Sequence, residues 1–374
     1  MKIPFNRPVY LQDSLKLIKK IVKAEKQINI GGDGYYCNLC ERLLTSLYNS
    51  SILLTSSCTH ALEMAAILTE IKPGDEVISP SYTFVSTVLP FEARGAKIKF
   101  VDIDNKTGNM DLDSLKKIIS KKTKVVITVH YAGNSTDMDE LVKICKKNKS
   151  ILIEDAAQAI GAKYKKKLLG TFGDLATLSF HETKNVTSGE GGALVVNNKK
   201  YLDRAKIIRE KGTNRSQFKE GLVDKYSWVD TGSSYVMSDL NAAYLYPQLK
   251  ALSKINKKRI LIKQRYEDKI NLKGGAYFLE TPKYNKTNGH ICAIVFPDNS
   301  LRKRFITYMK NNGVTAPFHY VSLHNSPYMN NNSECDLPGT AILSECLVRL
   351  PLYYQITELE VSRVIKLVNI FFNE

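Results

Sequence analysis

Short apolar runs alternate with amphipathic segments from about residue 50 to residue 200. The runs with strand character predict seven strands, at 52–55, 76–78, 97–103, 124–130, 151–157, 174–181 and 191–198. Segments with helical spacing predict helices at 60–71, 84–95, 111–120, 137–148 and 201–210. This alternation is typical of an α/β fold, in which helices cover both faces of a mostly parallel sheet. The carboxyl ends of such strands meet at one edge, where ligands bind.

The pattern changes beyond residue 210. Residues 211–234 mix charged and aromatic side chains without a clean period, which predicts a long loop of the kind that is usually functional. A helical stretch over 237–270 follows, and 271–374 has mixed α and β character. We therefore expect a large domain over 1–250, and a bridging helix with a smaller C-terminal α+β domain over 251–374.

The charge balance raises the question of nucleic-acid binding. The chain has 54 Lys and Arg against 37 Asp and Glu, a net charge of +17. The lysines are scattered in small groups over the polar faces of the predicted helices, which indicates a solvated surface rather than a nucleic-acid patch. A basic nucleic-acid-binding protein stays as the non-enzymatic alternative.

Two further classes of protein are disfavoured. No apolar run approaches the roughly 18 residues of a transmembrane helix, and the start MKIPFNRPVY lacks the apolar core of a signal peptide. We expect a cytoplasmic protein without a membrane partner. Cys37 and Cys40 form a CxxC pair with no second pair or nearby His, so we expect no metal site.

Two predicted strands end in groups that can carry chemistry. Glu154 and Asp155 close an apolar strand, and strand alternation points them to opposite faces. A carboxylate here is either a helix N-cap or a group that faces a ligand. Lys184 follows another apolar strand and precedes GEGG. A loop lysine is usually solvated, but near a sheet edge it can be desolvated, which lowers its pKa and makes the amine a nucleophile.

A third element lies at 56–59, where small hydroxyl residues precede a predicted helix. The amide groups at a helix N-terminus would hold a phosphate, although the same pattern alone is an ordinary N-cap. A phosphate seat, an acid at a strand end and a lysine after a strand, in this order, are the parts of a pyridoxal phosphate site. In such a site the lysine attaches the cofactor and the acid keeps the pyridine nitrogen protonated.

At this point the chain resembles a known family, the sugar-nucleotide aminotransferases of the DegT/DnrJ/EryC1/StrS group. The resemblance runs through GDG at 32–34, SCTHALEMAA, GDEVISPSYTFVST, GAKIKFVDID, HYAG, IEDAAQAIGA, SFHETKNVTSGEGG, MSDLNAA and FHYVSLH. The combination of EDAAQ with SFHxxKxxxxGEGG is the most specific. It implies the fold type I of pyridoxal phosphate enzymes, which is aspartate aminotransferase-like, with a seven-stranded sheet.

The resemblance implies roles for matching residues. Lys184 would hold pyridoxal phosphate and shuttle the proton, and Asp155 would pair with the pyridine nitrogen. The other implied cofactor contacts are Gln158 near the ring hydroxyl, Tyr82 on the ring face, and Cys58, Thr59 and Ser179 at the phosphate. Ser234 departs from the family pattern, since many relatives carry at its position an Asn that reaches the phosphate in the neighbouring subunit.

On the substrate side, the resemblance implies His319, Tyr320 and His324 of FHYVSLH. Lys211 and Arg215, in the 211–234 loop, could meet a diphosphate through charge-assisted hydrogen bonds. The alternatives are a structural histidine in an apolar stretch and a solvated loop charge.

Within the group, HETKN, REKGTNRSQF and the spaced DKY-W-D-GSSY-MSDL resemble the dTDP-4-oxo-6-deoxyglucose 4-transaminases. This implies a homodimer that transfers the amine of glutamate to C4 of a dTDP-linked 4-keto-6-deoxyhexose, in bacterial surface-polysaccharide biosynthesis. The galacto and gluco products both stay open, as do UDP- or GDP-sugars and amination at C3. Pyridoxamine-dependent dehydratases of the same group carry His in place of Lys184, so Lys184 favours transamination.

Overall fold

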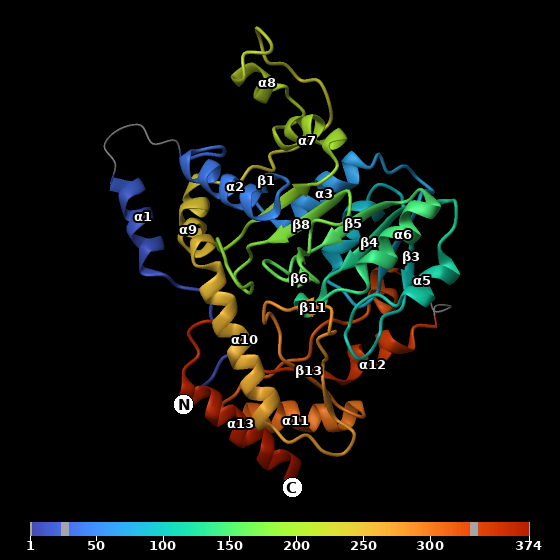
Figure 1. Ribbon diagram of the computed structural model, residues 1–374, viewed down its shortest axis with the longest axis vertical. Helices are drawn as coiled ribbons and strands as arrows, with labels where there is room; N and C mark the ends of the chain where they lie inside the picture. The colour runs from blue at the N-terminus through green and yellow to red at the C-terminus, as the bar shows by residue number, and fades with distance from the viewer. Residues whose placement is uncertain (1, 24–29, 330–335, 374) are drawn as a thin grey trace.

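The computed structural model describes residues 2–23, 30–329 and 336–373. Its centre is a seven-stranded sheet of order β1-β9-β8-β5-β4-β2-β3 (Figure 1). The strands are β1 (Ser51–Thr55), β2 (Glu76–Pro80), β3 (Lys97–Val101), β4 (Thr123–Val129), β5 (Ile151–Asp155), β8 (Leu175–Ser179) and β9 (Gly192–Val196). Neighbouring strands from β3 to β8 run parallel, and β9 runs antiparallel to β8 and β1. The predicted α/β class with a mostly parallel seven-stranded sheet is confirmed.

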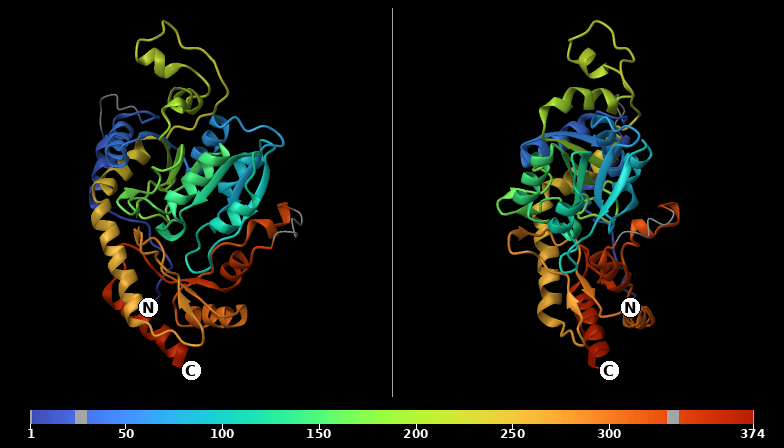
Figure 2. Two further views of the ribbon diagram at one scale, coloured as in Figure 1. Left: turned by 45° about the vertical axis from the view of Figure 1, so that its right-hand side comes forward. Right: turned by 90° about the vertical axis from the view of Figure 1, so that its right-hand side faces the viewer.

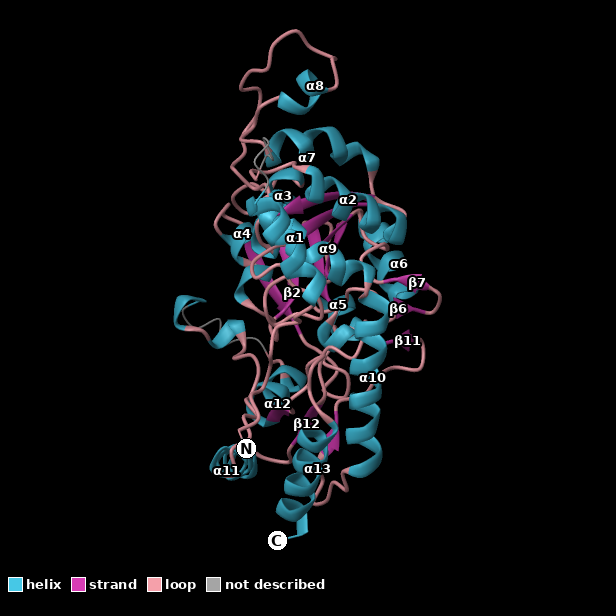
Figure 3. Ribbon diagram, turned by 90° about the vertical axis from the view of Figure 1, so that its left-hand side faces the viewer, coloured by secondary structure: helices cyan, strands magenta, loops and turns pink. Residues whose placement is uncertain are grey.

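Adjacent residues of each central strand face opposite cores, as the pleat of a strand requires. Val126 and Leu152 pack into one core, and their neighbours Val125 and Ile153 pack into the other. The first core includes helices α1 (Gln12–Lys23), α2 (Tyr35–Tyr48), α5 (Leu112–Ile118), α6 (Met138–Asn148) and α9 (Asp239–Lys250). The second includes α3 (Cys58–Leu68), α4 (Leu89–Glu92) and α7 (Leu202–Arg209) (Figure 3).

Helix α10 (Leu252–Lys269) runs from the central sheet into a second layer of structure (Figure 1). There β10 (Tyr277–Phe278), β12 (Ala293–Val295) and β13 (Leu347–Arg349) form an antiparallel sheet with α11 (Asn299–Asn311), α12 (Pro338–Cys346) and α13 (Glu358–Asn373). Ile262, Phe305 and Val364 belong to a separate core, which Ile3 of the N-terminal segment joins. A domain boundary at residue 250 stays a prediction.

The structure differs from the sequence predictions in three segments. The helix predicted over 84–95 is a 3₁₀ turn, η1 (Val85–Thr87), followed by α4. Pro90 lies in the first turn of α4, where its missing N–H has no cost, so a new helix begins there. The stretch over 237–270 is divided at Ala251 into α9 and α10. The loop over 211–234 contains α8 (Arg215–Lys219) and projects from the body of the molecule (Figures 1 and 2).

Cys37 and Cys40 lie on α2 and face the core. Their Sγ atoms are 3.4 Å from the carbonyl oxygens of Met237 and Ala242, so both thiols are packing groups between α2 and the segment around α9. Within the described ranges no group of His, Cys, Asp and Glu side chains is arranged to hold a metal ion. The helices of these same ranges also include none that is long and apolar enough to cross a membrane.

Candidate active site

A cavity of about 660 Å³ lies at the carboxyl edge of the central sheet. The ends of β4, β5 and β8 line it from one side, and Arg349 of β13 lines it from the C-terminal part. Eight residues singled out from the sequence line this cavity: Cys58, Thr59, Asp155, Gln158, Ser179, Lys184, His319 and Tyr320. A volume of this size suits a small-molecule ligand.

Helix α3 begins at the cavity. Ser57 caps the helix, because its Oγ accepts a hydrogen bond from the His60 N–H at 3.1 Å. A Cβ added at Gly192 of β9 would lie 2.4 Å from the Cys58 nitrogen, so glycine allows the helix to start directly against the sheet. Cys58 and Thr59 of the first turn line the cavity. The positive end of the helix therefore lies where a phosphate would bind.

Asp155 ends β5 with its carboxylate held from two sides. Its Oδ2 accepts a hydrogen bond from the Thr87 hydroxyl at 2.7 Å, and its Oδ1 accepts one from the Ala157 N–H at 3.1 Å. The next element of the described chain is β6 (Lys163–Tyr164), not a helix, so the alternative that Asp155 caps a helix is wrong. The remaining property of Asp155 is a fixed, buried negative charge at the cavity wall.

Glu154 points to the opposite face of β5 and is structural. Its carboxylate lies 2.7 Å from His130 Nε2 and accepts hydrogen bonds from the backbone N–H groups of Gly170, Phe172 and Gly173 at 2.6–2.7 Å. Burial alone would raise the pKa of this carboxyl group, but the hydrogen bonds from His130 and the backbone outweigh burial and lower the pKa.

Lys184 lies in the segment between β8 and β9 and reaches the same cavity. Burial lowers the pKa of its amine, and the positive charge of Arg349 acts in the same direction. The neighbouring Cys58 and Asp155 oppose this shift without reversing it. More of the amine is therefore neutral near pH 7 than in a solvated lysine, which is the form that acts as a nucleophile.

Aromatic residues form another wall. Gln158 Nε2 donates a hydrogen bond to the Tyr320 hydroxyl at 2.9 Å, which fixes both side chains. Tyr82 is 1% exposed and is not among the cavity-lining residues; its ring packs edge-on against Tyr131 and Tyr320. Phe84, two residues further along, lines the cavity and is 57% exposed. Phe84 is thus better placed than Tyr82 to cover the face of a bound ring.

The two predicted histidines have different surroundings. His319 lines the cavity, and its Nδ1 lies 2.6 Å from the Tyr131 hydroxyl. His324 is buried outside the cavity, where its Nδ1 lies 2.7 Å from Ser81 Oγ and its backbone N–H donates to the same oxygen. In this chain His324 is a satisfied structural histidine that fixes the segment following His319.

Three predicted residues lie away from the cavity of their own chain. Lys211 Nζ and Arg215 Nη1 are 3.7 and 3.8 Å from Glu210 Oε2 at the base of the projecting segment. Ser234 is exposed and forms a backbone bridge with Glu210. The structure of one chain therefore does not bring these three to the residues at Lys184.

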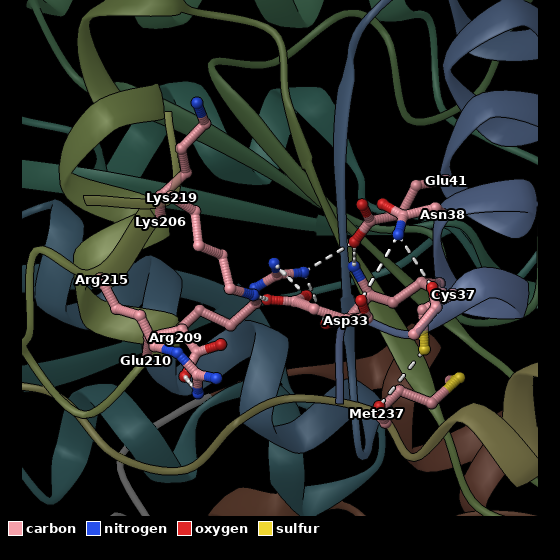
Figure 4. A network of polar contacts seen from close by, with 12 residues as sticks. Asp33, Cys37, Asn38, Glu41, Lys206, Arg209, Glu210, Arg215, Lys219 and Met237 are labelled. Carbon is pink, nitrogen blue, oxygen red and sulfur yellow. Dashed lines mark hydrogen bonds and ion pairs between the residues drawn. The ribbon is translucent and has the colours of Figure 1, made fainter. Parts of the chain in front are cut away.

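The base of the projecting segment is fixed by a buried arginine (Figure 4). Arg209 donates hydrogen bonds to Asp33 Oδ1 at 2.7 Å and to Glu41 Oε1 at 2.6 Å, and the same Glu41 oxygen accepts from the Leu54 N–H. Lys219 of α8 lies 3.7 Å from Asp33. The network ties the end of α7 to α2 and β1, so residues 211–234 project from a rigid base.

Two arginines that line the cavity were not among the residues predicted from the sequence. Arg349 Nη2 donates a hydrogen bond to the Phe318 carbonyl at 2.9 Å, and the Phe5 ring lies 4.3 Å from its guanidinium carbon. Arg259 is buried and donates to two carbonyls of the 289–290 turn, while its Nη1 has no hydrogen-bond partner among the described residues. Arg349 lies inside an apolar run of the sequence, just as Glu154 and Asp155 close the apolar run of β5. A charged residue in such a run was the signal that could have identified it.

The sequence profile of the DegT/DnrJ/EryC1/StrS aminotransferase family matches residues 15–369. The chain belongs to this family. It is an aminotransferase, and the proteins that it resembles include sugar aminotransferases.

Three similar proteins illustrate the relationship. The UDP-4-amino-4-deoxy-L-arabinose–oxoglutarate aminotransferase of Shewanella sediminis is 31% identical over 324 residues, which cover 83% of each chain. The spore coat polysaccharide biosynthesis protein SpsC of Bacillus subtilis is 30% identical and covers 84% of this chain and 83% of its own. The PLP form of Spr1654 from Streptococcus pneumoniae superposes with a TM-score of 0.90 at 23% identity, covering 100% and 99%.

The cofactor of this aminotransferase is pyridoxal phosphate, and the cavity fits it. The positive end of α3 suits the phosphate, the carboxylate of Asp155 suits a protonated ring nitrogen, and Lys184 offers an amine with a lowered pKa. Bound there, pyridoxal phosphate supplies an electron sink for negative charge at the reacting carbon. These three groups lie on three different elements that the sheet edge brings together.

The adjacent acids of β5 allow a matched test of stability against activity. We expect Glu154→Gln to lower the free energy of unfolding by roughly 3 kcal/mol, because the amide would present N–H groups to backbone donors. We expect Asp155→Asn to leave unfolding nearly unchanged and to lower turnover roughly 100- to 1,000-fold, as loss of a preorganised electrostatic contact does. Urea unfolding and steady-state kinetics of both variants check this, and a reversed pattern would contradict the assignment.

The stabilisation that Glu154 contributes should depend on pH in a definite direction. The pKa of Glu154 is lower in the folded state than the ordinary value of 4.5, so its stabilisation is complete above about pH 4.5 and is lost as the pH falls through the folded-state value. Glu154→Gln should therefore flatten the stability profile on the acid side of pH 4.5.

Proposed function

We propose that the protein transfers the amino group of glutamate to C4 of a dTDP-linked 4-keto-6-deoxyhexose and yields the dTDP-4-amino-4,6-dideoxyhexose of galacto or gluco configuration. The observation that carries the proposal is the Lys184 amine in a cavity with the fixed carboxylate of Asp155. We place this reaction in the cytoplasm, in the synthesis of a bacterial surface polysaccharide such as an O-antigen or common antigen.

The similar proteins support the chemistry in outline. The name of the Shewanella sediminis relative specifies a 4-amino sugar nucleotide and an oxoglutarate partner, which is the keto acid that corresponds to glutamate. The name of SpsC specifies polysaccharide biosynthesis. The assignment to dTDP rests on the HETKN, REKGTNRSQF and DKY-W-D-GSSY-MSDL segments, whereas the Shewanella relative uses UDP.

The residues of the cavity divide the work. The amine of Lys184 removes the proton from the donor carbon and later delivers a proton to the sugar carbon. Asp155 would hold the ring nitrogen of the cofactor in its protonated form, and the Thr87 hydroxyl orients that carboxylate. Phe84 and Tyr320 line the cavity with aromatic surface that excludes water from the reacting atoms.

The carboxylates of glutamate require cations, and the C-terminal wall supplies them. Arg349 and Arg259 line the cavity, and neither has an acidic partner among the described ion pairs. A guanidinium held by Phe5 and the Phe318 carbonyl is preorganised for a carboxylate. We assign Arg349 to the donor carboxylate.

The working unit in this proposal is a homodimer. The projecting segment holds large apolar side chains that are 44–81% exposed in the described chain: Phe218, Leu222, Tyr226, Trp228 and Val229. A two-fold partner would bury them and could bring Lys211, Arg215 and Ser234 of one chain to the cavity of the other. These three residues would then reach substrate or cofactor phosphates across the interface.

The central test uses the purified holoenzyme with glutamate and a panel of keto sugar nucleotides. We expect a dTDP-4-keto-6-deoxyhexose to be aminated at C4, with the product structure and configuration read by NMR. Lys184→Ala should lose nearly all turnover, because the same amine moves the proton. Amination of a UDP- or GDP-sugar instead, or at C3, would replace the proposed substrate, and full turnover by Lys184→Ala would contradict the mechanism.

The assignment of Arg349 predicts a selective defect. Arg349→Gln should raise KM for glutamate by about 10- to 150-fold, as loss of a charge-assisted hydrogen bond does, and should change KM for the sugar nucleotide far less. The matched control is Arg304→Gln, which removes an exposed arginine of α11 outside the cavity. An equal effect of both variants on glutamate would return Arg349 to a structural role.

If the projecting segment forms the dimer interface, a substitution in it should lower the molecular mass of the protein in solution from that of a dimer to that of a monomer. Trp228 is 81% exposed, and we expect Trp228→Glu to shift the protein from dimer to monomer in light scattering at micromolar concentration. Leu359→Glu serves as the control, since Leu359 is 78% exposed on α13 at the other end of the molecule. A fully active wild-type monomer would refute the dimer.

A further inference from the structure

The hydroxyl of Tyr131 and the imidazole of His319 form the shortest polar contact of the aromatic wall. Tyr131 begins η2 (Tyr131–Gly133), two residues after the end of β4, and His319 comes from the C-terminal part. The Tyr131 oxygen lies 2.6 Å from His319 Nδ1, and the Tyr82 oxygen lies 3.5 Å from that of Tyr131. His319 lines the cavity, whereas Tyr131 and Tyr82 are buried behind it.

The proton on each of these groups follows from hydrogen-bond accounting. If Tyr131 donates to His319 Nδ1, its proton has an acceptor at 2.6 Å, and its oxygen stays free for the longer contact of 3.5 Å with the Tyr82 hydroxyl. If Nδ1 instead carried the proton, Tyr131 would have to donate over 3.5 Å and the Tyr82 proton would have no acceptor among the described contacts. A buried hydroxyl without an acceptor is unfavourable, so the first arrangement is preferred.

We infer that Tyr131 is a positioning residue that locks His319 in the Nε2–H tautomer, so that His319 presents a neutral hydrogen-bond donor to an uncharged oxygen of the sugar. Nε2 has no partner among the described residues, and the ring is stacked on Tyr320 at 3.6 Å and 23°, which fixes its plane. The donor is therefore oriented before substrate enters.

The surroundings keep His319 uncharged. Burial lowers its pKa well below 6.5, and the charges of Arg349, Lys184 and His290 act in the same direction. Burial also raises the pKa of Tyr131 well above 10, so the phenol keeps the proton that it donates. Of the groups facing this ring, Tyr82 and Tyr320 are neutral as well, since burial raises their pKa values too.

The choice of an uncharged acceptor rests on the proposed function. The cavity already holds the guanidinium cations of Arg259 and Arg349, which suit carboxylate and phosphate groups. A neutral N–H adds little for an anion beside them, but it suits a hydroxyl or carbonyl oxygen of a hexose. His319 then contributes to recognition of the sugar ring and not to binding of glutamate.

The tautomer can be observed without any substrate. The chain has six histidines, so ¹⁵N-histidine labelling and a long-range ¹H–¹⁵N correlation spectrum of the holoenzyme resolve each ring, with His319→Gln identifying the His319 signals. We expect a pyrrole-type Nε2 and a pyridine-type Nδ1 that do not titrate between pH 6 and pH 8. In Tyr131→Phe both shifts should move toward the average of two tautomers. A pyrrole-type Nδ1 in the wild type, or an unchanged spectrum in Tyr131→Phe, overturns the inference.

Tyr82→Phe is the matched control. It removes a phenol from the same cluster but leaves the bond from Tyr131 to His319, so the tautomer should stay as in the wild type. Loss of the tautomer in this variant as well would show that general packing of the cluster, and not the Tyr131 hydroxyl, determines which nitrogen of His319 carries the proton.

Kinetics then test the role of the donor. Tyr131→Phe should raise KM for the sugar nucleotide roughly 3- to 10-fold, the value of one neutral hydrogen bond, and leave KM for glutamate unchanged. His319→Gln, which keeps an N–H donor, should be less impaired than His319→Ala. Equal impairment of the two variants, or a defect confined to glutamate, overturns the sugar contact. If the wild type aminates no sugar nucleotide, the proposed function fails, while the spectrum still decides the tautomer.

Discussion

The position of the candidate active site depends on the hydrogen bonds that the carboxylate of Glu154 accepts. It gathers four donors, one from His130 after β4 and three from the 170–173 turn that precedes β8. A buried charge is tolerated only when it is satisfied in this way, so the ends of β4 and β5 and the turn before β8 are held in one arrangement. Asp155, the next residue, faces the other side of the same strand end, and its place in the cavity follows from that of Glu154.

The cavity is assembled from parts that are distant in sequence, and the sheet edge and the C-terminal part supply different charged groups. The sheet edge supplies the fixed carboxylate of Asp155 and the amine of Lys184, whereas the C-terminal part supplies Arg259 and Arg349. Lys184, Arg259 and Arg349 line the cavity together with the acids Asp155 and Glu190, and Glu190 is largely exposed to solvent. The electrostatic potential in the buried part of the site is therefore positive, which suits an anionic cofactor and anionic substrates. The same field explains why burial and neighbouring cations lower the pKa values of Lys184, His290 and His319 together.

The strand pattern was sufficient to find the part of the site that lies on the sheet. Asp155 and Lys184 follow apolar runs whose length and alternation are local properties of the chain, and the structure places both at the cavity. The C-terminal wall depends on packing between distant segments, so no local pattern indicated that Arg349 lies against Phe5 or that Phe84, rather than Tyr82, lines the cavity. Pro90 was a sequence signal that the helix predicted over 84–95 is interrupted, but the apolar residues on either side of it kept helical spacing and so predicted a single helix.

In the proposed reaction one cavity must admit a small dicarboxylate and a much larger sugar nucleotide in turn, and its walls differ in a way that accommodates both. The cations respond to charge, which the two substrates share, so they cannot distinguish the donor from the acceptor by themselves. A neutral donor with a fixed tautomer and a stacked ring responds to the geometry of an uncharged oxygen, which only the sugar offers. Discrimination between the half-reactions therefore depends on the uncharged groups of the wall, while the charged groups provide affinity common to both.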